Sequence, residues 1–144
     1  MILCDVNVLI YAFREDAPNH AEYRAWIEER LASREAFAVS ELVLSSVIRV
    51  VTHPRIFNPP TPLDRALEFA QALRSQPNVV LVAPAERHWE IFTGLCMSAR
   101  AKGNLIADAY FAALAIEHGC EWYSADRDYS RFRGLRWKHP LDAS

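Results

Sequence analysis

The sequence has few of the residues on which several classes of protein depend. Only 4 of its 144 residues are glycine, and it contains no Walker loop, no G-x-G-x-x-G and no G-x-S-x-G motif. This excludes glycine loops that cradle phosphates and the nucleophile turn of serine hydrolases. The 3 cysteines lie far apart without a C-x-x-C pair, so the sequence indicates neither zinc nor disulfides and favours a reducing compartment.

Long hydrophobic runs and a strong charge of one sign are also missing. No stretch approaches the ~20 apolar residues of a membrane span, and the start lacks the basic region of a signal peptide, so we expect a cytoplasmic protein. The formal net charge is -2, so a polyanion partner must bind a local basic patch. With 51% hydrophobic and 24% charged residues, the composition predicts one globular domain over residues 1–144.

Short apolar runs alternate with helical patterns along the whole chain. The runs expected to form strands are 2–6, 36–40, 78–84 and 120–126, with a short edge strand within 135–140. Such alternation is typical of an α/β fold. The prediction is a single domain with a mainly parallel central sheet of four to five strands, flanked by helices.

Three acids occur where a site of such a fold would lie. Asp5 interrupts the first apolar run, and Asp126 follows the last long strand. Asp108 is the only charge between Asn104 and Glu117, in a segment that is otherwise almost entirely apolar. Binding sites of parallel sheets form beyond the carboxyl ends of the strands, and burying unpaired carboxylates is costly. We therefore expect these acids to converge and to be functional.

Each acid also has a structural interpretation. Asp126 and Asp128 suit the cap of a turn, and Asp108 suits the positive end of a helix. Asn7 is the expected cap of the helix that follows the first strand, which leaves Asp5 no helix to cap. Asp5 and Asp108 are therefore the stronger functional candidates, while Asp126 and especially Asp128 remain open between the two interpretations.

Converging carboxylates repel one another, and a cation relieves that repulsion. Oxygen ligands suit Mg²⁺, or Mn²⁺ in its place. Such an ion activates water and neutralises charge on a scissile phosphate. The 5 histidines are scattered, so no set of Cys and His ligands competes with the acids.

The last part of the chain, residues 127–139, carries a local excess of positive charge. Its cations are Arg127, Arg131, Arg133, Arg136 and Lys138, against one acid, Asp128. Arginine and lysine contact phosphates, and the interleaved aromatic residues suit unpaired bases. The alternative is a solvated edge whose aromatics pack inward; we expect Phe132 and Trp137 to belong to the core.

Three segments resemble the PIN domain, and in particular the VapC-type toxins of type II toxin–antitoxin pairs. They read "LCDVNVLIYAF", "GNLIADAYFAALAIEHG" and "WYSADRDYSRFRGLRWKHPL", and the resemblance covers essentially the whole chain. It implies a Mg²⁺-dependent endoribonuclease acting on structured RNA such as tRNA or rRNA. It also implies a homodimer, inhibited by a VapB-type antitoxin that covers the site.

The resemblance also implies roles for single residues. Asp5, Asp108 and Asp126 match the family's metal-binding, catalytic acids, and Asp128 is a candidate accessory ligand. Asn7 matches the small polar residue that supports the first acid, as part of a second layer around the metal.

One segment departs from the family pattern. Many members carry a glutamate inside the helix after the second strand, and the aligned position here is Ser46, which we place in that second layer. Glu41 lies five residues earlier and, at ~100° per residue, points elsewhere on a helix. Glu41 is therefore either an accessory ligand or a stabiliser of the helix N-terminus.

Other functions fit the sequence less well. A haloacid-dehalogenase-type phosphotransferase needs D-x-D after the first strand, where this chain has Asp5, Val6 and Asn7. A metal-free RNA-binding or scaffold module would explain the basic segment but not the buried acids, and it is the alternative that we carry forward.

Overall fold

The computed structural model describes residues 1–142, and its centre is a five-stranded sheet. The strands are β1 (Ile2–Cys4), β2 (Phe37–Val39), β3 (Val79–Leu81), β4 (Glu121–Tyr123) and β5 (Trp137–Lys138). Their spatial order is β3-β2-β1-β4-β5, and every pairing is parallel. This confirms the expected parallel sheet, including the short edge strand.

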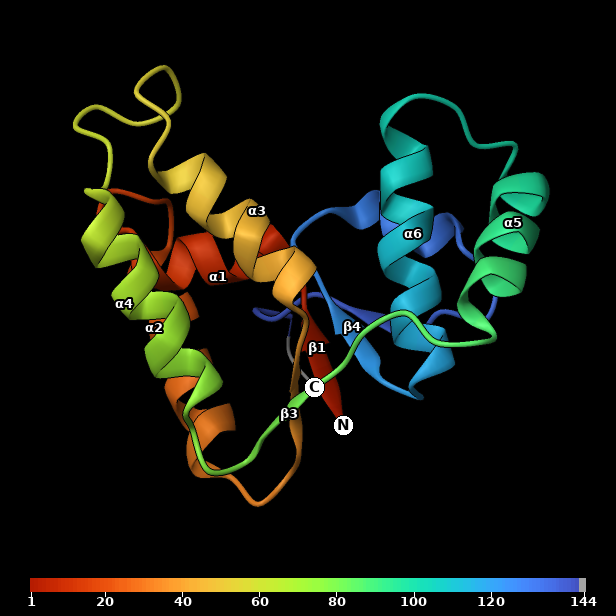
Figure 1. The fold of residues 1–144 in the computed structure, drawn as a ribbon, viewed down its shortest axis with the longest axis horizontal. Helices are drawn as coiled ribbons and strands as arrows, with labels where there is room; N and C mark the ends of the chain where they lie inside the picture. The colour runs from red at the N-terminus through yellow and green to blue at the C-terminus, as the bar shows by residue number, and fades with distance from the viewer. Residues whose placement is uncertain (143–144) are drawn as a thin grey trace.

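Helices cover both faces of the sheet. They are α1 (Val6–Phe13), α2 (His20–Ala32), α3 (Glu41–Val51), α4 (Leu63–Arg74), α5 (His88–Ala99) and α6 (Asn104–Glu117), with a 3₁₀ helix η1 (Arg127–Arg131). Figure 1 shows α1 to α4 grouped on one side of the strands and α5 with α6 on the other. Within residues 1–142, no helix combines the length and apolar character needed to cross a bilayer.

The two-sided cover explains why the central strands are apolar throughout. Ile2, Leu3 and Cys4 of β1 are all buried, because neighbouring strands flank β1 and helices pack above and below it. In β4, Trp122 is fully buried and its ring stacks on Phe111 of α6. The sheet is therefore a rigid base for whatever its ends carry.

The chain turns from β1 into α1 without a linker, which corrects one expectation. The backbone of Asp5 is still extended, and α1 begins at the next residue, Val6. Asp5 is thus the N-cap of α1, and the prediction that it has no helix to cap is wrong. Asn7 lies inside the first turn of the helix rather than before it.

Strand order determines which segments meet at the sheet's carboxyl edge. β1 and β4 are neighbours, and Cys4 pairs with Tyr123. Asp5 and the segment after β4 therefore leave the sheet side by side, although they are far apart in the sequence.

Candidate active site

Asp5 is held at the end of β1 by two hydrogen bonds. Its side chain is only 7% exposed; Oδ1 accepts from the N–H of Val6 at 2.7 Å and Oδ2 from the hydroxyl of Ser124 at 2.7 Å. Burial raises the pKa of Asp5 to about 6, although both hydrogen bonds oppose the rise, and the charges of Asp108 and Asp126 add to it. Asp5 is therefore a buried acid that feels both of the other acids predicted from the sequence.

Ser124 orients Asp5, a role that was not predicted from the sequence. The residue is fully buried directly after β4. Its Oγ accepts from Nδ2 of Asn7 at 3.3 Å and from the N–H of Asp126 at 3.0 Å. Because both neighbours donate, the single hydroxyl proton points to Asp5. The available signal was a polar residue directly after an apolar strand, one position before the acid-containing loop.

Asn7 acts on Asp5 through Ser124 rather than directly. Its Nδ2 donates to Ser124, and its Oδ1 accepts from the N–H of Ala125 at 3.3 Å. One side chain from α1 thereby ties that helix to the segment after β4. This is the position that a residue supporting the first acid would occupy.

Asp108 projects from the second turn of α6 and is half-buried. Burial raises its pKa most, the charges of Asp126 and Asp128 raise it further, and a hydrogen bond from Tyr129 lowers it. That bond joins the Tyr129 hydroxyl to Oδ1 at 3.3 Å. The structure thus brings Asp108 into the electrostatic range of Asp5 and Asp126.

Asp126 lies in the loop after β4, where it also caps η1. Its Oδ1 accepts from the N–H of Asp128 at 2.9 Å, which is the turn-capping role considered as its alternative. This bond leaves the second carboxylate oxygen of Asp126 open for another contact. Asp128 itself is exposed within η1.

The donor set of this edge fits a hard divalent cation. No ion pair within residues 1–142 involves Asp5, Asp108 or Asp126, so their charge is not balanced by a side chain. In the same part of the chain no three Asp, Glu, His or Cys side chains form a closed metal cage. Mg²⁺ does not need one, because it keeps several waters and uses one or two carboxylates.

The two α3 candidates point away from the acids. The side chain of Glu41 is 73% exposed, and its Oε2 pairs with Nη2 of Arg74 in α4 at 3.2 Å. Ser46 donates from Oγ to the carbonyl of Leu42 in its own helix at 3.1 Å. In this arrangement Glu41 links α3 to α4.

Part of the basic segment is already neutralised within the molecule. Arg127 pairs with Asp142 at 3.2 Å, and Lys138 on β5 pairs with Glu121 on β4. The second pair spans two adjacent parallel strands. These two cations therefore serve the fold as well as the local charge.

The other cations of the segment differ in their engagement. Arg136 donates from Nη2 to the carbonyl of Gly119 at 2.6 Å. Arg131 and Arg133 are exposed and form no ion pair within residues 1–142. Phe132 is buried as expected, whereas Trp137 is only half-buried, because it stands on the edge strand.

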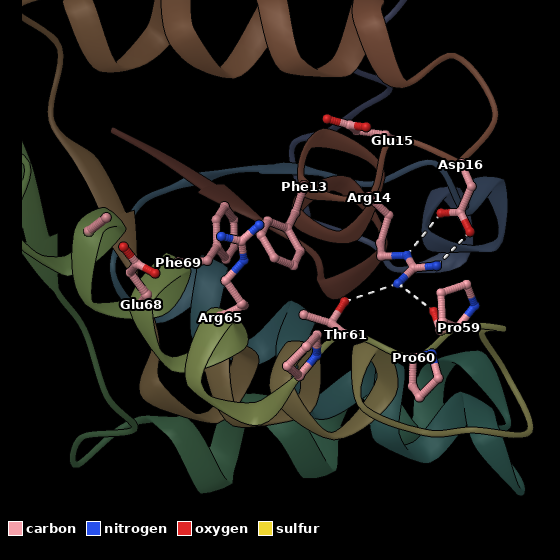
Figure 2. A pocket seen from close by; sticks show the side chains of 12 residues that line it. Phe13, Arg14, Glu15, Asp16, Pro59, Pro60, Thr61, Arg65, Glu68 and Phe69 are labelled. Atoms are coloured by element: carbon pink, nitrogen blue, oxygen red, sulfur yellow. Dashed lines mark hydrogen bonds and ion pairs between the residues drawn. The ribbon is translucent and has the colours of Figure 1, made fainter.

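The most spacious hollow of the described surface lies elsewhere. It measures about 670 Å³ and lies between the end of α1, the loop at 59–62 and α4, and none of the three acids lines it. Figure 2 shows Arg14 at its side, where Nη1 donates to the carbonyl of Pro59 at 3.0 Å and to Oγ1 of Thr61 at 3.1 Å. With these partners and Asp16, Arg14 is fully engaged in holding the loop.

Comparison with known proteins places this geometry in context. A family model described as PIN domain matches residues 2–135. Ribonuclease VapC43 of Mycobacterium tuberculosis is 45% identical over 142 residues, which cover 99% of this chain and 97% of the relative. Ribonuclease VapC25 of the same organism is 42% identical over 140 residues, 97% of this chain and 99% of the relative.

Solved structures share the fold at much lower identity. The crystal structure of VapBC2 from Rickettsia felis, bound to a promoter DNA fragment, aligns with a TM-score of 0.73 at 16% identity, covering 96% of this chain and 98% of that chain. The Mycobacterium tuberculosis VapC20 structure, described as a sarcin-ricin loop cleaving toxin, aligns with a TM-score of 0.66 at 16% identity, covering 94% and 98%.

Proposed function

Because the chain belongs to the PIN domain family, we propose that it is a Mg²⁺-dependent endoribonuclease, the toxin of a type II toxin–antitoxin pair. It hydrolyses phosphodiester bonds in structured RNA, with tRNA or rRNA as the expected class. Relatives that are named VapC ribonucleases and match nearly the whole chain support this proposal.

One observation carries the metal-dependent part. Asp5 and Asp108, which come from opposite ends of the chain, both have raised pKa values at the same edge of the sheet. Burial is the main cause, and the neighbouring acids add to it without a compensating cation among residues 1–142. Such uncompensated negative charge favours a bound divalent ion.

The acids divide the work of the site. Asp5 and Asp108 hold Mg²⁺, and Asp126 completes or borders the site with its open oxygen. When bound, the ion supplies an oriented water and neutralises charge that develops on the phosphate. Asn7 keeps Asp5 in place through Ser124. Keeping the two first acids fixed matters because positioning and charge stabilisation provide most of the catalysis of phosphoryl transfer reactions.

Three positions have subordinate roles in this proposal. Asp128 and Glu41 are accessory acids that could approach the site only after leaving their present positions. Ser46 stands on α3 in the layer around the metal, where a hydroxyl replaces the carboxylate that many family members carry.

RNA binds along the basic segment after β4. Arg131 and Arg133 are the cations most available for phosphates, because they are exposed and without an ion pair in the described chain. Arg127, Arg136 and Lys138 add to the local potential from their internal partners. Because the net charge is -2, this local excess is what attracts a polyanion.

The proposal extends to partners and location. We expect a cytoplasmic homodimer that is inhibited by a cognate VapB-type antitoxin covering the acid edge. The solved VapBC complexes among the fold neighbours support an antitoxin of this type.

A cleavage assay on structured cellular RNA tests the proposal. Asp108→Asn keeps the size of the side chain and removes its charge, so we expect a loss of activity of about 1000-fold. Chelation of the metal in the wild-type protein should stop cleavage equally. Asp64→Asn, an exposed acid in the first turn of α4, is the matched control and should cleave normally.

The outcome separates the proposal from its alternative. Full cleavage by folded Asp108→Asn, or cleavage that survives chelation, would contradict a metal-dependent nuclease. RNA binding without any cleavage in Mg²⁺ would instead support a metal-free RNA-binding or scaffold module.

A further inference from the structure

The hydroxyl of Tyr129 is the single anchor of the Asp108 carboxylate. Within residues 1–142, the only hydrogen bond to this carboxylate is the one that Tyr129 donates to Oδ1 at 3.3 Å. Asp5, by comparison, accepts two hydrogen bonds. Asp108 is also half-buried rather than buried, so packing restrains its side chain less than that of Asp5.

The position of the Tyr129 hydroxyl is itself well fixed. The residue is 1% exposed, and its ring packs on Trp122 with centroids 5.3 Å apart and on Phe132 at 5.9 Å. A buried ring between two aromatic neighbours has little rotational freedom. Tyr129 belongs to η1 and Asp108 to α6, so the hydrogen bond links two separate elements.

Packing alone does not require a tyrosine at this place. A phenylalanine would fill the same aromatic layer, because the contacts with Trp122 and Phe132 are made by the ring. What the hydroxyl adds is the hydrogen bond to Oδ1 of Asp108. A polar atom in a buried layer, aimed at a carboxylate of the site, indicates a role in the site.

We propose that Tyr129 is a positioning residue that fixes the orientation of Asp108 and presents its Oδ2 to the divalent cation. The inference rests on the proposed function of Asp108 as a metal ligand. By occupying Oδ1, the phenol restricts Asp108 to binding through one oxygen and removes the entropy loss of orienting the side chain when the ion binds.

Metal binding without RNA tests this role directly. The probe is Mn²⁺, titrated into the full chain and followed by the EPR signal of the free ion. Tyr129→Phe should weaken Mn²⁺ binding about tenfold, the lower end of the effects seen for residues that orient metal ligands. Tyr110→Phe is the matched control, because it removes a phenol on α6 whose ring packs on His88 and Phe92; it should bind as the wild type does.

A double substitution distinguishes positioning from a general loss of structure. If Tyr129 acts through Asp108, then Tyr129→Phe should have no further effect on Mn²⁺ affinity in an Asp108→Asn background. An equal loss in both backgrounds would overturn the inference, because it would reflect altered packing. Unchanged or tighter Mn²⁺ binding by Tyr129→Phe alone would overturn it as well.

The same titration separates this inference from the proposed function. A wild-type protein that binds no Mn²⁺ contradicts the metal site as a whole, and the role of Tyr129 falls with it. A wild type that binds Mn²⁺ and needs Asp108 to do so, with Tyr129→Phe unaffected, leaves the function standing and refutes only the positioning role.

Discussion

Asp5→Asn should make the metal-free protein more stable while it destroys the site. The rise of the Asp5 pKa from its ordinary 3.8 to about 6 reflects burial first, and then the neighbouring acids. At about 1.36 kcal/mol per unit of pKa, ionised Asp5 costs the fold about 3 kcal/mol at pH 7. Asparagine removes that cost but forfeits one acceptor for a hydrogen bond, worth about 1 kcal/mol. The expected net gain is about 2 kcal/mol.

The sign of the pH dependence follows from the raised pKa. The folded protein binds the Asp5 proton more tightly than the unfolded chain does, so the cost is absent below the unfolded pKa of 3.8 and complete above about 6. The advantage of Asp5→Asn should therefore be largest at pH 7 and should mostly vanish by about pH 4. Urea unfolding in a chelator at both pH values measures it.

Two further measurements make the test of Asp5 specific. Asp64→Asn, on an exposed helix turn, should change stability by less than about 0.5 kcal/mol at either pH. Adding Mg²⁺ should narrow the gap at pH 7, because only the wild type binds the ion in its folded state. An Asp5→Asn protein that is less stable than the wild type at pH 7, or a gap that does not depend on pH, would refute the reasoning.

Two other predictions concern charge. Replacing both Arg131 and Arg133 by Gln should weaken RNA binding and lower the slope of log K against log salt by about 1 for each phosphate that is no longer bound, whereas Arg136→Gln should change it less, because Arg136 is bonded to a carbonyl; filter binding over a salt series measures both. Glu117 accepts from two N–H groups before α5, each at 2.9 Å; burial raises its pKa, but these bonds and nearby His charge outweigh that and lower it. Glu117→Gln should cost about 1 to 2 kcal/mol at pH 7 and much less below about pH 4, where the wild-type carboxylate is protonated; equal losses at both pH values, measured by urea unfolding, would contradict this.

The fold could be predicted because local and global signals agree. Each apolar run followed by a helical pattern is a βα unit, and repeated units favour a parallel sheet. The start of α1 was misplaced because Asn7 is the better cap by residue type alone. Asp5 takes the cap position because the chain is still extended there, which depends on its pairing with β4.

The site was only partly readable for a related reason. Carboxylates in apolar segments stand out in a sequence, so Asp5 and Asp108 could be named from it. The hydroxyls of Ser124 and Tyr129 could not, because their roles depend on contacts across 119 and 21 positions of the chain. The ion pair that holds Glu41 depends in the same way on how α4 packs against α3.

The pairing of β1 with β4 also determines when the proposed nuclease can become active during its own synthesis. Asp5 leaves the ribosome almost first, but the strand that stands beside it and the hydroxyl that orients it come 119 residues later. A growing chain therefore carries one acid without a site through most of translation. Unfinished chains are harmless to the RNA around them, and activity begins only when nearly the whole protein has emerged.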